Sequence, residues 1–344
     1  MNILFDIGHP AHVHLFKNLI MFFGEKGYKV FVVSREKDIT NLLLNYYKIN
    51  YISLSKSKNG VFGMISEMLV RDLKICLLHY KIKFDIAIGT SVSIGHLSCV
   101  SKVRSYNFNE DDDVAVPLYT LAAYPFCTKI INSDCVKYKR FRYKRVTHNS
   151  FQKLAYLHPD NFTPDIDILK KYNLEPYSYI VLRHSALKAH HDFEAQGIDH
   201  RIKNRFKKIF DKYNIITSDE STKLHDIEPW DMHHILFYAK LLITDSMSMA
   251  VESSVLGVPS VRYNSFVGKS SVLDELEIKF KLTYGFKAGE MGEIDKMYDK
   301  VNALLETKNL NRVWQKKREK MLKEKLDMNQ WMINYFESEI KKII

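Results

Sequence analysis

The sequence predicts an α/β fold made of two doubly wound domains, each built around a parallel sheet. The chain has 344 residues, which exceeds the size at which one hydrophobic core stops growing. Short β-rich apolar runs alternate with longer stretches of helical period, and this alternation is interrupted once before it resumes. Hydrophobic residues make up 46% and charged residues 26%, so the whole chain is expected to fold.

The first domain is expected to span residues 1–160. Its strands are predicted at residues 3–5, 29–33, 51–54, 86–89 and 129–132, and its helices at 13–25, 39–47, 61–79 and 94–101. The rhythm is lost between residues 135 and 176, where Pro159, Pro164 and Pro176 punctuate polar and aromatic residues. We interpret this stretch as the linker region.

The second domain is expected to span residues 161–344. Its strands are predicted at residues 179–183, 214–217, 241–244 and 259–263, and its helices at 203–213, 231–239 and 247–256. From residue 290 the pattern is helical and rich in lysine. In a two-domain fold such a terminal helix often crosses back onto the first domain.

The sequence indicates a cytoplasmic protein. No apolar run reaches the roughly 20 residues needed to span a bilayer, and the first residues lack the features of a signal peptide. The four cysteines are not paired closely enough for a zinc site or a disulfide framework, so we expect reduced thiols, no metal and no cofactor.

The net charge of +11 raises the question of an acidic partner. We interpret the densest basic cluster first as a solvated surface, second as a patch for anionic lipid headgroups at the inner face of the cell membrane, and third as a nucleic-acid patch. No nucleic-acid partner is expected, because no helix-turn-helix, RNA-recognition or zinc-finger pattern accompanies the charge. The cluster consists of Lys137, Lys139, Arg140, Arg142, Lys144 and Arg145.

A phosphate site is predicted where the strand at residues 241–244 ends. Asp245 or Ser246 can cap the following helix, whose outward amides and positive dipole end suit an anion. Glu252 lies one to two turns farther along, where a carboxylate can accept hydrogen bonds from ribose hydroxyls. The alternative is simple capping with a solvated Glu252.

Three histidines follow the first predicted strand: His9, His12 and His14. Open α/β sheets bind ligands at the carboxyl ends of their strands, and a histidine there can act as a general base. Zinc ranks low, because His12 and His14 do not share a helix face. Some of the three histidines are expected only to hydrogen-bond the turn.

An acidic loop, residues 109–113, provides further candidates for the base, with Glu110 and Asp112 foremost. Adjacent carboxylates repel each other, so the cluster is costly unless it is solvated, matched by cations or used in catalysis. Its spacing does not match a calcium loop. The alternative is an exposed acidic loop.

More polar groups end the strands of the second domain. Arg183 is positioned for a pyrophosphate clamp. Ser218 and Glu220 follow the next strand, at the same edge of the sheet.

Taken together, these residues resemble family 354 of the domains of unknown function. The resemblance covers nearly the whole chain, through FDIGHPAHVH (5–14), GTS (89–91), NEDD (109–112), LAYLHP (154–159), AHHD (189–192) and NSFVG (264–268). More distantly, the chain is similar to GT-B glycosyltransferases, in which two Rossmann-like domains face a cleft, and to UDP-N-acetylglucosamine 2-epimerases.

The epimerase pattern Thr-Asp-Ser-Gly-Gly followed by a glutamate is similar to residues 244–248 and Glu252. The resemblance implies phosphate contacts from Ser246 and Ser248 and a ribose contact from Glu252. Here Met247 and Ser248 replace both glycines, so a close backbone approach is not implied. His12 also resembles the histidine of a Gly-Gly-His turn in the transferase of the lipid-linked peptidoglycan precursor, although the flanking glycines are absent.

The sequence therefore predicts an inverting, metal-independent glycosyltransferase with a nucleotide-sugar donor, expected to be a UDP-sugar, and a glycan or lipid-linked acceptor. His12, Glu110 or Asp112 would be the base, and His9 would join Arg183, Ser218, Glu220 and the helix start at Ser246 in binding substrate. The alternatives are a UDP-sugar 2-epimerase and a non-catalytic sugar-nucleotide binding module.

Overall fold

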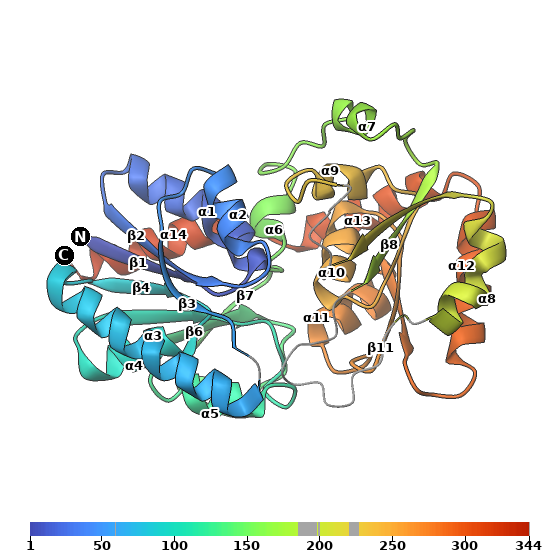
Figure 1. Cartoon of the computed structure of the whole chain (residues 1–344). Coiled ribbons are helices and arrows are strands. Elements are labelled where there is room, and N and C mark those ends of the chain that lie inside the picture. Colours follow the sequence, from blue (N-terminus) through green and yellow to red (C-terminus); the bar gives the residue numbers. More distant parts are fainter. Residues whose placement is uncertain (59, 185–197, 199, 220–226, 344) are drawn as a thin grey trace. The chain divides into compact units, whose positions relative to one another are not determined.

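The computed structural model describes residues 1–58, 60–184, 198, 200–219 and 227–343 (Figure 1). The chain divides into two compact units, residues 1–156 with 326–344 and residues 157–325. The division expected at residue 160 assigned the whole tail to the second domain, whereas residues 326–344 group with the first unit. In both units the sheet is parallel and helices connect its strands, so the predicted α/β class with two Rossmann-like domains is confirmed.

The first unit contains a seven-stranded sheet in the order β3-β2-β1-β4-β5-β6-β7. The strand order reverses between β1 and β4, which is the point where open sheets of this kind bind ligands. Two of the strands, β5 and β7, were not predicted from the sequence. The strands are β1 (Asn2–Ile7), β2 (Lys29–Glu36), β3 (Ile52–Lys56), β4 (Ile86–Gly89), β5 (Arg104–Phe108), β6 (Lys129–Ser133) and β7 (Arg145–His148).

The helices of this unit are α1 (Pro10–Glu25), α2 (Thr40–Tyr46), α3 (Gly60–Ile82), α4 (Val92–Val100), α5 (Pro117–Ala123) and α14 (Met328–Lys341), with a 3-10 turn η1 (Arg142–Lys144) and a short helix α6 (Leu154–Leu157). Helix α14 packs against α1, with the Phe23 and Phe336 ring centroids 6.3 Å apart. The Tyr106 hydroxyl donates to Glu339 at 2.6 Å. The terminal helix therefore completes the core of the first unit, as the sequence suggested.

The second unit contains a five-stranded parallel sheet in the order β12-β11-β10-β8-β9. Its strands are β8 (Tyr179–His184), β9 (Asn214–Asp219), β10 (Leu241–Thr244), β11 (Ser260–Asn264) and β12 (Thr283–Lys287). Its helices are α7 (Asp167–Lys171), α8 (His200–Phe210), α9 (Met232–Phe237), α10 (Met247–Leu256), α11 (Ser271–Asp274), α12 (Glu293–Glu306) and α13 (Leu310–Glu324), with one π-helical turn η2 (Glu275–Lys279).

Helix α10 ends at Gly257, which adopts a φ of 73°, in the left-handed region. A Cβ at this position would lie 2.7 Å from Nε2 of Gln315, the side chain through which α13 caps α10 by donating to the Leu256 carbonyl at 2.9 Å. Gly257 is thus favoured for two reasons: its φ is in the left-handed region, and α13 packs too closely for a Cβ.

The stretch expected to be a linker, residues 135–176, contains regular structure. It includes β7, which extends the sheet beyond β6, as well as α6 and α7. The interpretation of the whole stretch as a linker is therefore wrong. None of the helices among the described residues is both long and apolar enough to cross a membrane.

Candidate functional site

The turn after β1 places two of the predicted histidines at the start of α1. His9 is the N-cap, and its Nδ1 accepts a hydrogen bond from the Ala11 amide at 3.2 Å. Pro10 occupies the first helical position, where its missing amide and fixed φ are tolerated. Because the helix begins three residues earlier than predicted, His12 lies in its first turn.

His12 is held by the turn after β4. Its Nδ1 lies 2.8 Å from Oγ1 of Thr90, at the adjacent strand end. His12 is half-buried, and desolvation, together with the smaller effects of the positive charges of Lys153 and Lys37, lowers its pKa to about 3. The imidazole is therefore neutral at physiological pH, and in this environment it is a weaker base than an ordinary histidine.

The turn that carries Thr90 is fixed on several sides. A Cβ at Gly89 would lie 2.7 Å from the Asp6 carbonyl oxygen, so β4 approaches β1 more closely than other residues permit. The Tyr119 hydroxyl donates to the Thr90 carbonyl at 2.6 Å, and Ser91 donates its hydroxyl proton to the Asp6 carboxylate. These contacts fix the position of the His12 partner.

Asp6 is fully buried and forms an ion pair with Arg71 of α3. The same guanidinium donates to the Ser34 carbonyl at 3.2 Å and to the Ser55 hydroxyl at 3.1 Å. Burying two charges costs several kcal/mol unless additional hydrogen bonds satisfy them, as they do here. The network joins β1, β2, β3 and α3 beneath the His12 turn. It was not predicted, because its members are distant in sequence.

Lys153 reaches the same region from the segment after β7. This segment is anchored on α1, since Asn18 donates to the Ala155 carbonyl at 3.1 Å and the rings of His14 and Tyr156 stack at 5.2 Å. His14 is thus a packing residue, as expected for some of the three histidines. The Lys153 side chain is almost fully buried.

The acidic loop is only partly exposed. Glu110 accepts a hydrogen bond from the Gln152 amide at 2.5 Å, next to Lys153. Asp112 is buried and accepts from the Lys137 amide at 2.8 Å. The interpretation as a wholly exposed acidic loop is therefore wrong, while a role for Glu110 or Asp112 as base stays a prediction.

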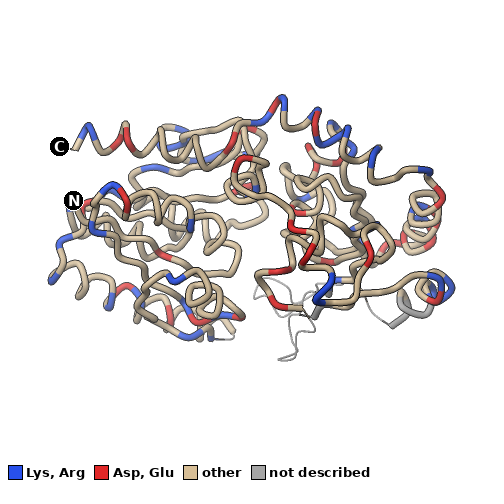
Figure 2. The backbone as a smooth tube through the Cα atoms, turned by 90° about the horizontal axis from the view of Figure 1, so that it is seen from above, with Lys and Arg blue, Asp and Glu red and all other residues tan. Residues whose placement is uncertain are grey.

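The residues of the basic cluster do not all lie at the surface. Arg145 pairs with the buried Asp113 at 2.5 Å and lies 4.7 Å from the Tyr124 ring centroid. Lys144 donates to the Cys127 carbonyl at 2.8 Å. The interpretation as a single solvated or lipid-binding surface is therefore wrong for Arg145, whose side chain is buried. Lys and Arg elsewhere are scattered among Asp and Glu (Figure 2).

In the second unit, α10 begins where the sequence predicted. Ser246, rather than Asp245, is the N-cap, and its hydroxyl accepts from the Met249 amide at 3.4 Å. The Asp245 carbonyl accepts from the Asn264 side chain at 2.7 Å, which anchors the turn on β11. Ser248 lies in the first turn and is half-buried. This helix start can hold an anion.

Glu252 is buried in α10, so the alternative of a solvated carboxylate is wrong. Its Oε2 lies 3.6 Å from Nε2 of His233, a residue of α9 that the sequence analysis missed. Nothing in the local pattern connects the two residues, because the contact depends on the packing of α9 against α10.

Arg183 lies at the same edge of the sheet as the start of α10, which is the candidate phosphate site. In the sheet register it is opposite Thr244 of β10, two residues before Ser246, and opposite Ser218 of β9. Arg183 and Ser218 are therefore brought together with the start of α10 at one edge of the sheet. Glu220 and the AHHD segment at 189–192 lie outside the described residues.

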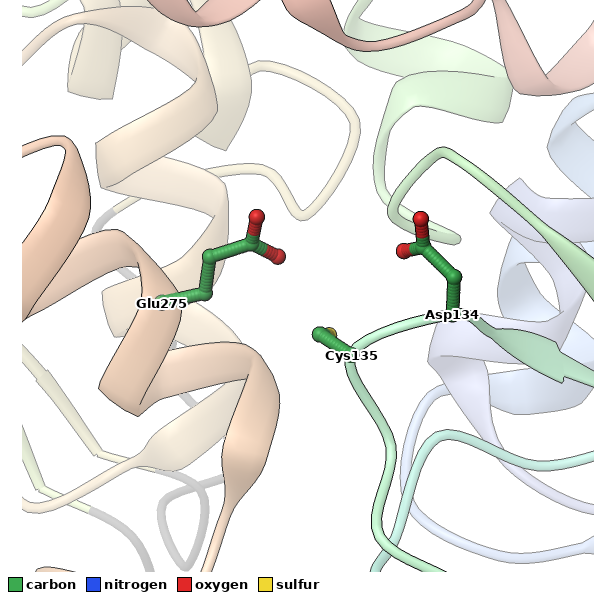
Figure 3. Close-up of side chains that lie close together, drawn as sticks. All are labelled: Asp134, Cys135 and Glu275. Atoms are coloured by element: carbon green, nitrogen blue, oxygen red, sulfur yellow. The ribbon is translucent and has the colours of Figure 1, made fainter.

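Figure 3 shows three further side chains with metal-binding chemistry, Asp134 and Cys135 after β6 and Glu275 at the start of η2. Within the first unit, the Cys135 thiol donates to the Ser133 hydroxyl at 3.3 Å. Within the second, Glu275 accepts from the Lys325 ammonium at 2.9 Å. We assign no metal to them, and the expected absence of a metal stays a prediction.

Known proteins resemble the chain in structure but not detectably in sequence. No protein-family model matches it, so membership of family 354 stays a prediction. No curated protein matches it either.

Among solved structures, a UDP-GlcNAc 2-epimerase from Neisseria meningitidis bound to UDP-GlcNAc has a TM-score of 0.70 at 10% identity, covering 99% of this chain and 100% of that one. A UDP-N-acetylglucosamine 2-epimerase from Rickettsia bellii has a TM-score of 0.68 at 14% identity, with coverages of 100% and 98%. The spinosyn forosaminyltransferase SpnP has a TM-score of 0.66 at 12% identity, with 99% of both chains covered. These likenesses show the fold, which is that of GT-B-like epimerases and glycosyltransferases.

Proposed function

We propose that this protein is an inverting, metal-independent GT-B glycosyltransferase of surface polysaccharide synthesis. Its donor would be a nucleotide-sugar, with UDP as the expected nucleotide, and its acceptor a glycan or a lipid-linked sugar. The fold supports an enzyme acting on nucleotide-sugars, because its structural neighbours include a UDP-GlcNAc 2-epimerase and a forosaminyltransferase. The proposal places the reaction in the cytoplasm.

The donor half of the proposal rests on the second unit. The start of α10 at Ser246 and the guanidinium of Arg183, which is adjacent through the β8 and β10 register, would bind the diphosphate. Ser248 and Ser218 lie at the same edge. Glu252 would accept a hydrogen bond from the ribose, with His233 orienting its carboxylate.

The part of the proposal that concerns the acceptor rests on His12, and the placement of His12 is the observation that carries the proposal. The His12 imidazole follows the carboxyl end of β1 and is held through Nδ1 by Thr90, and this geometry supports a role in taking a proton. The acceptor oxygen would attack the anomeric carbon while its proton passes to His12. The bond between that carbon and the phosphate oxygen would break, and Arg183 with the α10 start would stabilise the departing diphosphate.

Glu110 is the second candidate for the base. Its carboxylate is fixed by the Gln152 amide at 2.5 Å, on the segment that carries Lys153 toward His12. Asp112 supports this loop through the Lys137 amide. His9, as the N-cap of α1, would contact the acceptor through its ring.

A UDP-sugar 2-epimerase is the alternative, favoured by the sequence Thr244-Asp245-Ser246 followed by a buried Glu252. In that reaction acid and base groups would eliminate the nucleotide and add it back to the same sugar. A binding module without turnover is the third possibility.

One incubation separates the three functions. Purified protein is mixed with UDP-, GDP- and CMP-sugars, with and without candidate acceptors, and free nucleotide and altered sugar are measured. Nucleotide release that requires an acceptor supports the transferase. Conversion or hydrolysis of the sugar without acceptor supports the epimerase, and nucleotide binding without turnover supports the module.

The base is tested in the same assay with His12→Ala. Loss of a general base lowers turnover by roughly 10² to 10⁴ and leaves nucleotide affinity nearly unchanged. Near-normal turnover of a folded variant would move the role to Glu110.

A further inference from the structure

Helix α3 exposes a continuous apolar stripe. Phe62 is 90% exposed, Leu73 is 62% exposed and Tyr80 is 75% exposed, although such residues are ordinarily buried. The exposed apolar residues follow one another at intervals of three and four, which places them on one face of the helix. They are Phe62, Ile65, Leu69, Leu73, Leu77 and Tyr80.

The segment that leads into α5 also exposes apolar residues. Val114, Leu118 and Leu121 are also exposed apolar residues. Helix α4 packs against both α3 and α5, and Figure 1 shows the three helices along one side of the first unit. We call the exposed apolar residues of α3 and of the segment 114–121 the α3/α5 face. An accumulation of exposed apolar residues of this kind usually marks an interaction site.

The charges on α3 are of one sign at its surface. Lys74 and Lys81 are exposed, and Lys83 follows just beyond the helix. The helix has two carboxylates, and neither is exposed: Glu67 is buried and paired with Arg35 at 2.7 Å, and Asp72 bonds to His96 at 2.7 Å. The stripe is therefore flanked by cations without exposed anions on the same helix.

This charge pattern favours one class of partner. In a symmetric dimer that pairs α3 with the partner's α3, the exposed lysines would meet no exposed carboxylate on that helix to neutralise them. An anionic lipid surface would neutralise them and would also bury the apolar side chains, as it does for amphipathic helices that lie in the membrane interface.

We propose that the α3/α5 face binds the surface of an anionic membrane, with Phe62, Leu69 and Leu73 inserted among the lipids. Lys81 and Lys83 would contact the headgroups, whereas the Lys74 ammonium donates to the Leu54 carbonyl at 2.5 Å. The proposal goes beyond the reaction, because it holds for any acceptor, and it is independent of the prediction that the basic cluster binds lipid.

The test uses the full chain and vesicles of phosphatidylcholine with or without phosphatidylglycerol, in the absence of any sugar donor. Wild type should sediment with the anionic vesicles. The triple variant Phe62→Ser, Leu69→Ser, Leu73→Ser should bind at least about tenfold more weakly, since the burial of even one of these side chains contributes a factor of about ten or more. The matched control is Ile278→Ser with Met291→Ser, which removes two exposed apolar residues of the second unit and should bind like wild type.

Neutralising Lys81 and Lys83 to Gln should weaken binding at low salt by about fivefold per lysine, and added salt should remove this difference. Insertion is read directly from Phe62→Trp, whose fluorescence should be quenched by bromine-labelled lipid, whereas that of Met291→Trp should not. Circular dichroism and thermal unfolding establish that each variant is folded.

Wild-type protein that ignores anionic vesicles would overturn the proposal, and so would a folded triple variant that binds as wild type does. A dimer in light scattering that the triple variant dissociates, without vesicle binding by wild type, would assign the face to a second copy. Because no donor is present, none of these results depends on whether the protein is a transferase.

Discussion

The neutral state of His12 makes a quantitative prediction about stability and pH. In the folded protein its pKa is about 3, whereas in the unfolded chain it returns to its ordinary value of 6.5. Below pH 6.5 the unfolded chain binds a proton that the folded protein does not, so acidification favours unfolding. The stability that the folded protein gains by keeping His12 neutral is fully present above pH 6.5 and is lost as the pH falls toward 3.

The size of the effect follows from the pKa difference. Each pH unit below 6.5 removes up to about 1.4 kcal/mol, so acidification to about pH 4.5 removes roughly 2 to 3 kcal/mol of unfolding free energy through this one residue. The variant His12→Gln cannot titrate, and its carboxamide can still bond to Thr90.

Urea unfolding of wild type and His12→Gln across this pH range measures the difference directly. Other titrating groups are common to both proteins and cancel. Wild type should lose its stability relative to the variant by roughly 1 kcal/mol per pH unit below 6.5. Parallel pH profiles for the two proteins would show that His12 titrates normally, and the conclusion that His12 is neutral in its half-buried turn would then be refuted.

The remaining predictions concern three other positions. Glu252→Ala should weaken nucleotide-sugar binding by about 1 to 3 kcal/mol, read by titration calorimetry, and unchanged affinity would remove α10 from the donor site. Gly89→Ala should destabilise the protein by about 1 to 3 kcal/mol, because its Cβ would meet the Asp6 carbonyl, whereas Gly24→Ala, with nothing within 4 Å, should stabilise it by about 0.5 to 1 kcal/mol in urea unfolding. Asp112→Asn retains an oxygen for the Lys137 amide and should change unfolding by about 1 kcal/mol or less, so a hundredfold fall in turnover would identify Asp112 as a catalytic group.

Elements with local signals were predictable from the sequence. Helix α10 was predicted at its observed ends, because Ser246 caps its start and Gly257 permits the left-handed turn after its end. Strands β4 and β10 are short apolar runs and were also predicted at their observed bounds.

Strands β5 and β7 were missed because their sequences are polar. Strand β7 begins at the last residue of the basic cluster, Arg145, which becomes buried against Asp113 and the ring of Tyr124. This neutralisation connects residues 32 positions apart in sequence, so a local pattern does not show it.

The candidate site was predictable to a similar extent. The strand ends indicated His12, Arg183 and Ser246, because parallel strands deliver their carboxyl ends to one edge. The partners of these groups were not indicated. Thr90 is 78 positions from His12 in the chain, and only the pairing of β1 with β4 brings them together.

Helix α3 shows why the membrane face was also missed. Its helical period was recognised, but an apolar stripe is ordinarily taken to face the core. Here the buried residues of α3 are Glu67, Arg71 and Ile75, and the first two meet Arg35 and Asp6.

The buried charges determine which way α3 faces. Rotating the helix to bury its apolar stripe would break the pair of Arg71 with the fully buried Asp6, and removing one partner of such a pair costs about 3 to 5 kcal/mol. It would also separate Glu67 from Arg35. The polar network beneath the His12 turn therefore fixes the orientation of α3 and leaves its apolar side chains at the surface. The residues that organise the candidate active site thus also leave the apolar residues of α3 exposed to solvent.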